Sequence, residues 1–76
     1  MAMATHRGVV KFFRAEKGWG GITSPEVPGD VWFHLSDIEA KGQRWPEDGQ
    51  PVEFECVKQQ QDSWQYVATR VRLISN

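Results

Sequence analysis

The chain has 76 residues, of which 39% are hydrophobic and 25% charged, and its formal net charge is −1. These values are typical of one small soluble domain, and the total charge gives no indication of a polyanionic partner. The single cysteine, Cys56, excludes an internal disulfide, and no stretch is apolar for long enough to span a membrane. We therefore expect a cytoplasmic protein with no membrane partner.

The charges are distributed unevenly along the chain. Residues 7–17 carry four cations and one acid, whereas residues 26–55 carry eight acids and two cations. Such asymmetry can create a locally positive face on a nearly neutral protein. The alternative is that these charges are scattered over solvated faces and have no functional meaning.

Five short segments have the alternation and composition of β-strands, and none has the pattern of a long helix. In chain order they are residues 7–14, 19–23, 31–35, 51–58 and 63–73. A loop rich in proline and glycine is expected at 24–30, and a long surface connection at 39–49. Five strands without a long helix predict a small closed barrel, which removes exposed sheet edges.

The first strand follows a lead, residues 1–6, that we expect to be disordered or a remnant of expression. Strict alternation within residues 7–14 places Lys11 and Phe12 on opposite faces. Both side chains can face one ligand only if the strand bends or contains a bulge, which is common in small barrels.

The second and third strands each expose an aromatic face. In residues 19–23, Trp19 lies on the face opposite to Ile22, and in residues 31–35, Trp32 and His34 lie opposite to the apolar residues. The outer face of a half-buried sheet is ordinarily polar. Two tryptophans there predict a flat, π-rich ligand. A short helical turn, capped by Ser36, is expected at 36–38.

The last two strands alternate between an inner and an outer face. In residues 51–58 the inner set is Val52, Phe54 and Cys56, and the outer set is Glu53 and Glu55. In residues 63–73 one face carries Val67, Thr69, Val71 and Leu73. Arg70 and Arg72 are expected on a solvated face, and Trp64 and Tyr66 are interpreted as packing or edge residues.

Over residues 7–74 the chain resembles the bacterial cold-shock proteins. The segments that carry the resemblance are GVVKFF (8–13), EKGWGGI (16–22), DVWFHLSDI (30–38) and EDGQPVEF (47–54). The second and third of these resemble the two ribonucleoprotein motifs of the family, which usually read close to KGFGFI and VFVHF. The resemblance implies an all-β fold, a five-stranded antiparallel OB-fold Greek-key barrel formed by residues 7–74.

The resemblance also implies a function. It is the binding of single-stranded RNA or DNA with low sequence specificity, as an RNA chaperone or a regulator of transcription or translation, by a monomer. The implied nucleic-acid-binding residues are Lys11, Phe12, Arg14, Lys17, Trp19, Trp32, His34 and Leu35, and Trp45 is a candidate substitute contact. Aromatic rings would stack on bases, and the lysine and arginine side chains would follow the phosphates.

The chain departs from the family pattern at several positions. Gly21 and Leu35 stand where the two motifs normally have phenylalanine, and Gln43 stands where a loop aromatic is often found. Phe12 replaces the usual tryptophan, and Arg14 the commoner asparagine. We therefore expect a shorter or weaker footprint on nucleic acid than is normal for the family.

Catalysis is not expected. Cys56 belongs to an inner face by its pattern, away from His6 and His34 as partners in a nucleophilic dyad. These three residues are the only soft ligands, so no metal site is expected, and no phosphate loop or dinucleotide fingerprint is present. The sequence thus predicts no enzyme, no cofactor and no small-molecule substrate.

A second class of function stays open at this point. Small barrels with exposed aromatic residues also bind proline-rich or other extended peptides, in the manner of SH3 domains. Lysine and arginine beside the aromatic residues favour nucleic acid, whereas the acids that follow Glu26 are compatible with a peptide groove.

Overall fold

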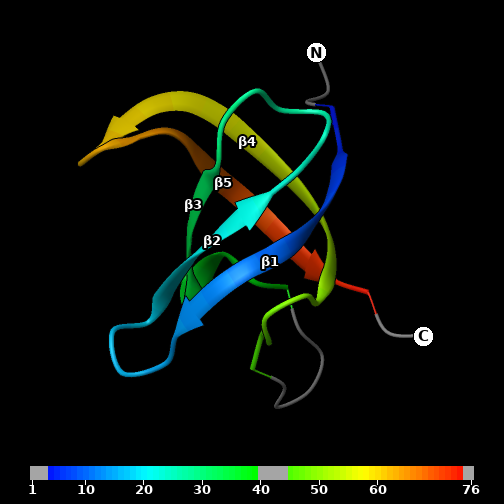
Figure 1. Ribbon diagram of the computed structural model, residues 1–76, viewed down its shortest axis with the longest axis vertical. Helices are drawn as coiled ribbons and strands as arrows, with labels where there is room; N and C mark the ends of the chain where they lie inside the picture. The colour runs from blue at the N-terminus through cyan, green and yellow to red at the C-terminus, as the bar shows by residue number, and fades with distance from the viewer. Residues whose placement is uncertain (1–3, 40–44, 75–76) are drawn as a thin grey trace.

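The computed structural model describes residues 4–39 and 45–74, and its five strands close into a barrel (Figure 1). The strands are β1 (His6–Arg14), β2 (Trp19–Thr23), β3 (Val31–His34), β4 (Pro51–Gln61) and β5 (Trp64–Leu73). Around the barrel their order is β1-β2-β3-β5-β4, and β4 pairs with β1 to close it. The pairing of β3 with β5 is parallel and the other four are antiparallel. The predicted five-stranded barrel is confirmed.

The bend predicted in the first strand is present as a β-bulge in β1. Val10 pairs with Ile22 on β2 and Phe12 with Gly21, so the register shifts at Lys11. Val10 is buried, whereas Lys11 is exposed and Phe12 half-buried. An extra residue in one strand inverts the alternation beyond it. The bulge therefore lets Lys11 and Phe12 leave the barrel on the same side, as predicted.

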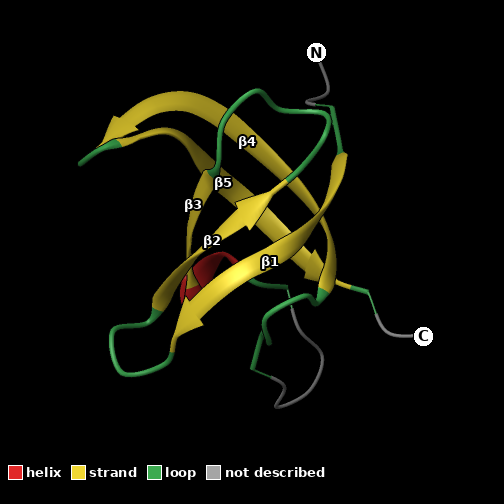
Figure 2. Ribbon diagram, in the orientation of Figure 1, coloured by secondary structure: helices red, strands yellow, loops and turns green. Residues whose placement is uncertain are grey.

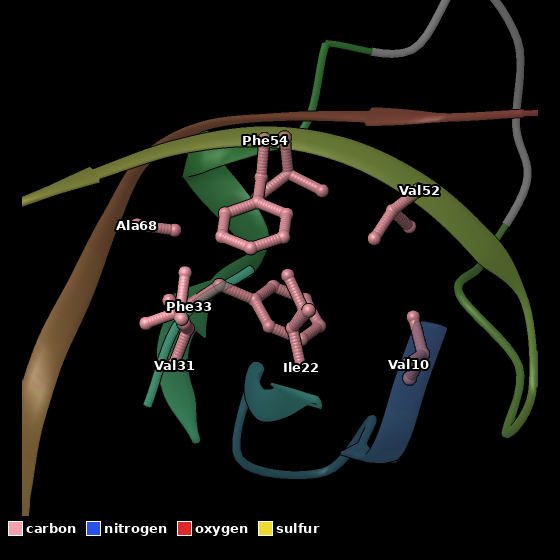
Figure 3. Packing of buried hydrophobic residues seen from close by; sticks show 9 residues of the cluster. Val10, Ile22, Val31, Phe33, Val52, Phe54 and Ala68 are labelled. Atoms are coloured by element: carbon pink, nitrogen blue, oxygen red, sulfur yellow. The ribbon is translucent and has the colours of Figure 1, made fainter. Parts of the chain in front are cut away.

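The inward positions of the strands, with Val27 from the loop between β2 and β3, form the hydrophobic core (Figure 3). Its members, all between 0% and 8% exposed, are Val10, Ile22, Val27, Val31, Phe33, Val52, Phe54, Ala68 and Val71. Complete burial of a Val, Ile or Phe side chain stabilises a fold by about 1.5–3 kcal/mol. The predicted inward positions of β2, β3 and the first half of β4 are confirmed.

Alternation fails in β5. The register with β4 shifts between Glu55 and Cys56, so Thr69 is left without a partner on β4. As a result Ala68 is buried and Thr69 is exposed. The predicted shared face is therefore wrong at Val67 and Thr69, because Tyr66 and Ala68 pack inward instead. Cys56, next to the shift, is half-buried rather than part of the core. Its partial burial raises the pKa of the Cys56 thiol.

The helical turn after β3 lies one residue earlier than predicted. Leu35–Asp37 form a 3-10 helix, η1, so Leu35 is not a strand residue (Figure 2). The N-cap is His34 instead of Ser36. The backbone N–H of Ser36 donates to the imidazole at 3.0 Å, and the Asp37 carboxylate accepts from the backbone N–H of His34 at 2.9 Å. Such reciprocal capping satisfies two backbone donors at a helix start.

The strand ends differ slightly from the prediction, and some expectations fall outside the described residues. β1 begins at His6, which pairs with Phe54, and β4 continues to Gln61, beyond the expected end at 58. The first three residues of the expected lead and Gln43 are among the residues that are not described. In the described part of the chain, no helix is long and apolar enough to cross a membrane.

The outer face of β4 and β5 carries ion pairs between strands. Glu53 accepts hydrogen bonds from Arg72 on β5 and from Arg7 on β1, and Arg70 pairs with Glu39 at 2.8 Å. Arg70 and Arg72 are exposed, as predicted for a solvated face. The hydrogen bond from Arg72 lowers the pKa of the Glu53 carboxyl below its ordinary 4.5; partial desolvation opposes this effect, and Arg7 adds to it.

The ion pair between Glu53 and Arg72 predicts that the stability of the fold depends on pH. A carboxyl whose pKa is lowered by folding stabilises the fold above its unfolded-state pKa and loses that contribution as the pH falls through its folded value. We expect the free energy of unfolding to decline as the pH drops below about 4.5, and Glu53→Gln to make the decline shallower. Urea unfolding across this range measures both. Glu16→Gln, an exposed carboxyl in the β1–β2 turn, is the control; identical pH profiles for the Glu53 variant and the original chain would contradict the assignment.

Candidate functional site

Five aromatic residues from four strands gather on one side of the barrel. We call them the aromatic surface; they are Phe12 on β1, Trp19 on β2, Trp32 and His34 on β3, and Trp64 on β5. The ring centroids of Phe12 and Trp19 are 5.6 Å apart, those of Trp19 and Trp32 6.4 Å, and those of Trp32 and His34 6.2 Å. The rings thus form a continuous series, as the sequence predicts for the first four.

The register between β2 and β3 places the two central indoles. Trp19 is opposite His34, and Gly21 is opposite Trp32. Trp19 and Trp32 are therefore diagonal neighbours, which lie within reach of each other for aromatic side chains. The inward positions of both strands are filled by Ile22, Val31 and Phe33, all 0% exposed (Figure 3). The half-buried indoles therefore lie outside the core.

Trp64 is the member of this surface that the sequence indicates only as a packing or edge residue. Its ring centroid lies 6.1 Å from that of Phe12 and 6.3 Å from that of Trp19, edge-on to the Trp19 ring at 82°. The signal available in the sequence is the glycine at position 21, where the family motif normally has phenylalanine, together with a tryptophan at position 64. That signal is not sufficient, because it does not show that β5 brings Trp64 to β2.

The predicted cations differ in the contacts that they already make. The Lys11 ammonium is 2.7 Å from a carboxylate oxygen of Asp30, and the Arg14 guanidinium lies over the Phe12 ring, 5.4 Å from its centroid. Lys17 is exposed in the turn that leads to Trp19. Arg7, the fourth cation of residues 7–17, forms an ion pair with Glu53 instead. The local positive charge therefore comes from three side chains, one of which is already paired.

His34 is exposed and its ring is oriented by its role as the cap of η1. Because Nδ1 accepts the backbone N–H of Ser36, the proton of the neutral ring lies on Nε2. Nε2 makes no hydrogen bond to the described residues, so it is available as a donor next to Trp32. The capping hydrogen bond and contact with a ligand are thus compatible.

Two predicted site residues, Leu35 and Trp45, are not among the rings of the aromatic surface. Leu35 is half-buried at the start of η1. Trp45 is 55% exposed, and its ring lies 5.9 Å from Phe13, which itself stacks on the core residue Phe33 at 5.8 Å. The contacts of Trp45 within the described chain therefore connect it to the core side of β1 and not to Phe12 or Trp19.

An open groove lies beside Trp64. Its volume is about 440 Å³, and its walls are formed by Gly29 and Asp30 before β3 and by Ser63, Trp64 and Gln65 at the start of β5. Residues 4–39 and 45–74 contain no cluster of three or more His, Cys, Asp or Glu residues arranged to hold a metal ion. The chemistry available here is stacking, hydrogen bonding and charge pairing.

The sequence matches the family model described as the 'Cold-shock' DNA-binding domain over residues 6–74. It is 42% identical over 52 residues to the cold shock-like protein of Aquifex aeolicus, covering 68% of this chain and 74% of that protein. It is 45% identical over 56 residues to the probable cold shock protein y4cH of Sinorhizobium fredii, covering 74% and 78%. It is 50% identical over 54 residues to cold shock protein CspA of Staphylococcus saprophyticus, covering 68% and 77%.

The fold is also found in solved structures. The chain is similar to the drosophila Unr CSD456 structure, with a TM-score of 0.74 at 19% sequence identity. The similarity covers 97% of this chain and 28% of the Unr chain, and at this identity it shows the shared fold alone. Together with the match over residues 6–74, the closed barrel establishes that the chain belongs to the cold-shock domain family.

Proposed function

We propose that the chain binds single-stranded RNA or DNA with low sequence specificity and acts as an RNA chaperone or as a regulator of transcription or translation. The observation that carries this proposal is the continuous aromatic surface outside a core that is complete without it. Its residues are Phe12, Trp19, Trp32, His34 and Trp64. Membership of the cold-shock domain family supports nucleic-acid binding in general.

The physical basis is stacking. Every nucleobase has a π-face, so an aromatic ring can hold a base without distinguishing it from the others, at about 1–3 kcal/mol for each stacked base. Phe12, Trp19 and Trp32 together could contribute roughly 3–9 kcal/mol before the cost of ordering the strand. Lys11, Arg14 and Lys17 are exposed, and we expect them to follow the phosphates of a strand bound on this surface.

We further propose that the protein acts as a monomer in the cytoplasm. Closure of the barrel pairs every strand with two neighbours, which reduces the sheet edge through which a second copy could add a strand. The single thiol of Cys56 suits a reducing compartment.

Titration of oligo-dT and oligo-U, followed by tryptophan fluorescence, tests the function. Because bases are expected to stack on Trp19 and Trp32, we expect quenching that saturates with either oligonucleotide. A proline-rich peptide of similar length is the comparison. A response to the peptide alone would reject nucleic acid as the partner and favour a peptide-binding module.

Removal of one platform is expected to weaken binding without unfolding the domain. Trp19→Ala and Trp32→Ala should each reduce the affinity for oligo-dT by about 1–3 kcal/mol, because each removes a stacking face outside the core. Trp45→Ala is the matched control and should change affinity little, since its ring packs on Phe13. Fluorescence titration and urea unfolding measure the two effects. Loss of folding in a Trp19 or Trp32 variant would show that this residue is structural.

Salt dependence measures the phosphate contacts. Each phosphate neutralised on a single strand contributes about −0.7 to the slope of log affinity against log salt, so three cations predict a slope of about −2. Lys17→Gln should make the slope shallower by about 0.7. Arg72→Gln, which removes a cation paired with Glu53, is expected to leave it unchanged. A slope near zero for the original chain would remove the phosphate-binding role from Lys11, Arg14 and Lys17.

A further inference from the structure

Trp64 begins β5 directly after the turn that joins it to β4 (Figure 1). Its strand pairs with β3 and β4, yet its indole approaches the rings of Phe12 on β1 and Trp19 on β2. The ring therefore extends across the outside of the barrel from β5 toward β2. In this position it joins the same series of rings as the two central indoles.

Gly21 provides the space for this indole. A Cβ atom at position 21 would lie 2.8 Å from Cη2 of Trp64, 3.2 Å from its Cζ3 and 3.0 Å from Cε1 of Phe12. A side chain there would have to displace the Trp64 ring. The glycine on β2 and the tryptophan on β5 are thus complementary in shape.

The burial of Trp64 does not come from the core. The half-buried apolar residues that pack against the core, within the described chain, are Phe13, Ile38, Cys56, Tyr66 and Leu73, and Trp64 is not one of them. Its ring contacts are with Phe12 and Trp19, which lie outside the core. A residue needed only to fill the barrel would be expected to contact the interior.

The open groove of about 440 Å³ lies next to Trp64. Its volume is within the range of small-molecule sites, which is sufficient for a nucleobase with its sugar. Trp64 forms one wall of the groove. Ser63 and Gln65 are exposed polar neighbours whose side chains can form hydrogen bonds with the edge of a base. The groove is continuous with the aromatic surface through Trp64 itself.

We propose that Trp64 is an additional stacking platform, made possible by Gly21, and that one unpaired nucleobase of the bound strand lies against it in the groove formed with residues 29–30 and 63–65. The inference rests on the proposed function, the binding of single strands, and specifies where that strand continues. It adds a base-stacking position on β5 to those expected on β1–β3, and adds about one nucleotide to the footprint.

The test compares Trp64→Leu with the original chain in fluorescence-anisotropy titrations of labelled oligo-dT of increasing length. Leucine keeps an apolar side chain over Gly21 but has no π-face. We expect the affinity to fall by about 5- to 150-fold, the equivalent of one lost stacked base, and the length at which affinity stops rising to shorten by about one nucleotide. Trp64→Phe should retain most of the affinity. Trp45→Leu, the same replacement away from the aromatic surface, is the matched control.

The outcomes separate the two proposals. If the original chain binds no single strand, the proposed function fails and the inference with it. If the original chain binds and Trp64→Leu, folded by circular dichroism, has the same affinity and length dependence, the inference alone is overturned.

A second measurement on the unaltered protein covers the case in which Trp64→Leu does not fold. Photocrosslinking to oligo-dT that carries 5-iododeoxyuridine, mapped by mass spectrometry, should give an adduct at Trp64 in addition to the central indoles. Adducts at Trp19 or Trp32 without one at Trp64 at any iododeoxyuridine position would overturn the inference.

Discussion

The inward packing of β2 and β3 is the constraint on which the rest of the structure depends. Ile22, Val31 and Phe33 have no exposed surface, and successive residues of a strand point to opposite faces. Once these three are inside, Trp19 and Trp32 must be outside. A shift of one residue would place both indoles in a barrel already filled by valines and phenylalanines. The register that buries the core therefore also determines that the indoles lie outside.

The aromatic surface also needs two interruptions of regular strand geometry. The bulge at Lys11 turns Phe12 outward while Phe13 returns to stack on Phe33. Gly21 leaves an opening on β2 that the Trp64 indole occupies. Each feature would weaken an ordinary strand, since a bulge breaks the ladder and glycine lacks a side chain to pack. Here both bring a ring to the same surface.

The positions that local alternation governs could be predicted from the sequence, whereas those that depend on the pairing of β5 could not. Trp19, Trp32 and His34 were assigned to one face because β2 and β3 alternate without interruption. The face of Thr69 was wrong because its bulge exists only in the register of β5 with β4. The sequence indicates Trp64 only as a packing or edge residue for a related reason. Its neighbours Phe12 and Trp19 are more than 40 residues away in the chain and meet it only when the barrel closes.

In the proposed binding of a single strand, the rings and the cations are expected to contribute unequally to the binding free energy. Lys11 is paired with Asp30, and Arg14 lies over the Phe12 ring, so a strand on this surface must exchange existing contacts for new ones. Such exchange reduces the net gain from each phosphate, and a chain with a net charge of −1 attracts a polyanion only locally. Within the described residues a cation covers only the Phe12 ring, and none lies over Trp19 or Trp32. Under the proposed function, most of the binding free energy is therefore expected from the rings, which accept any base and would give the proposed low sequence specificity.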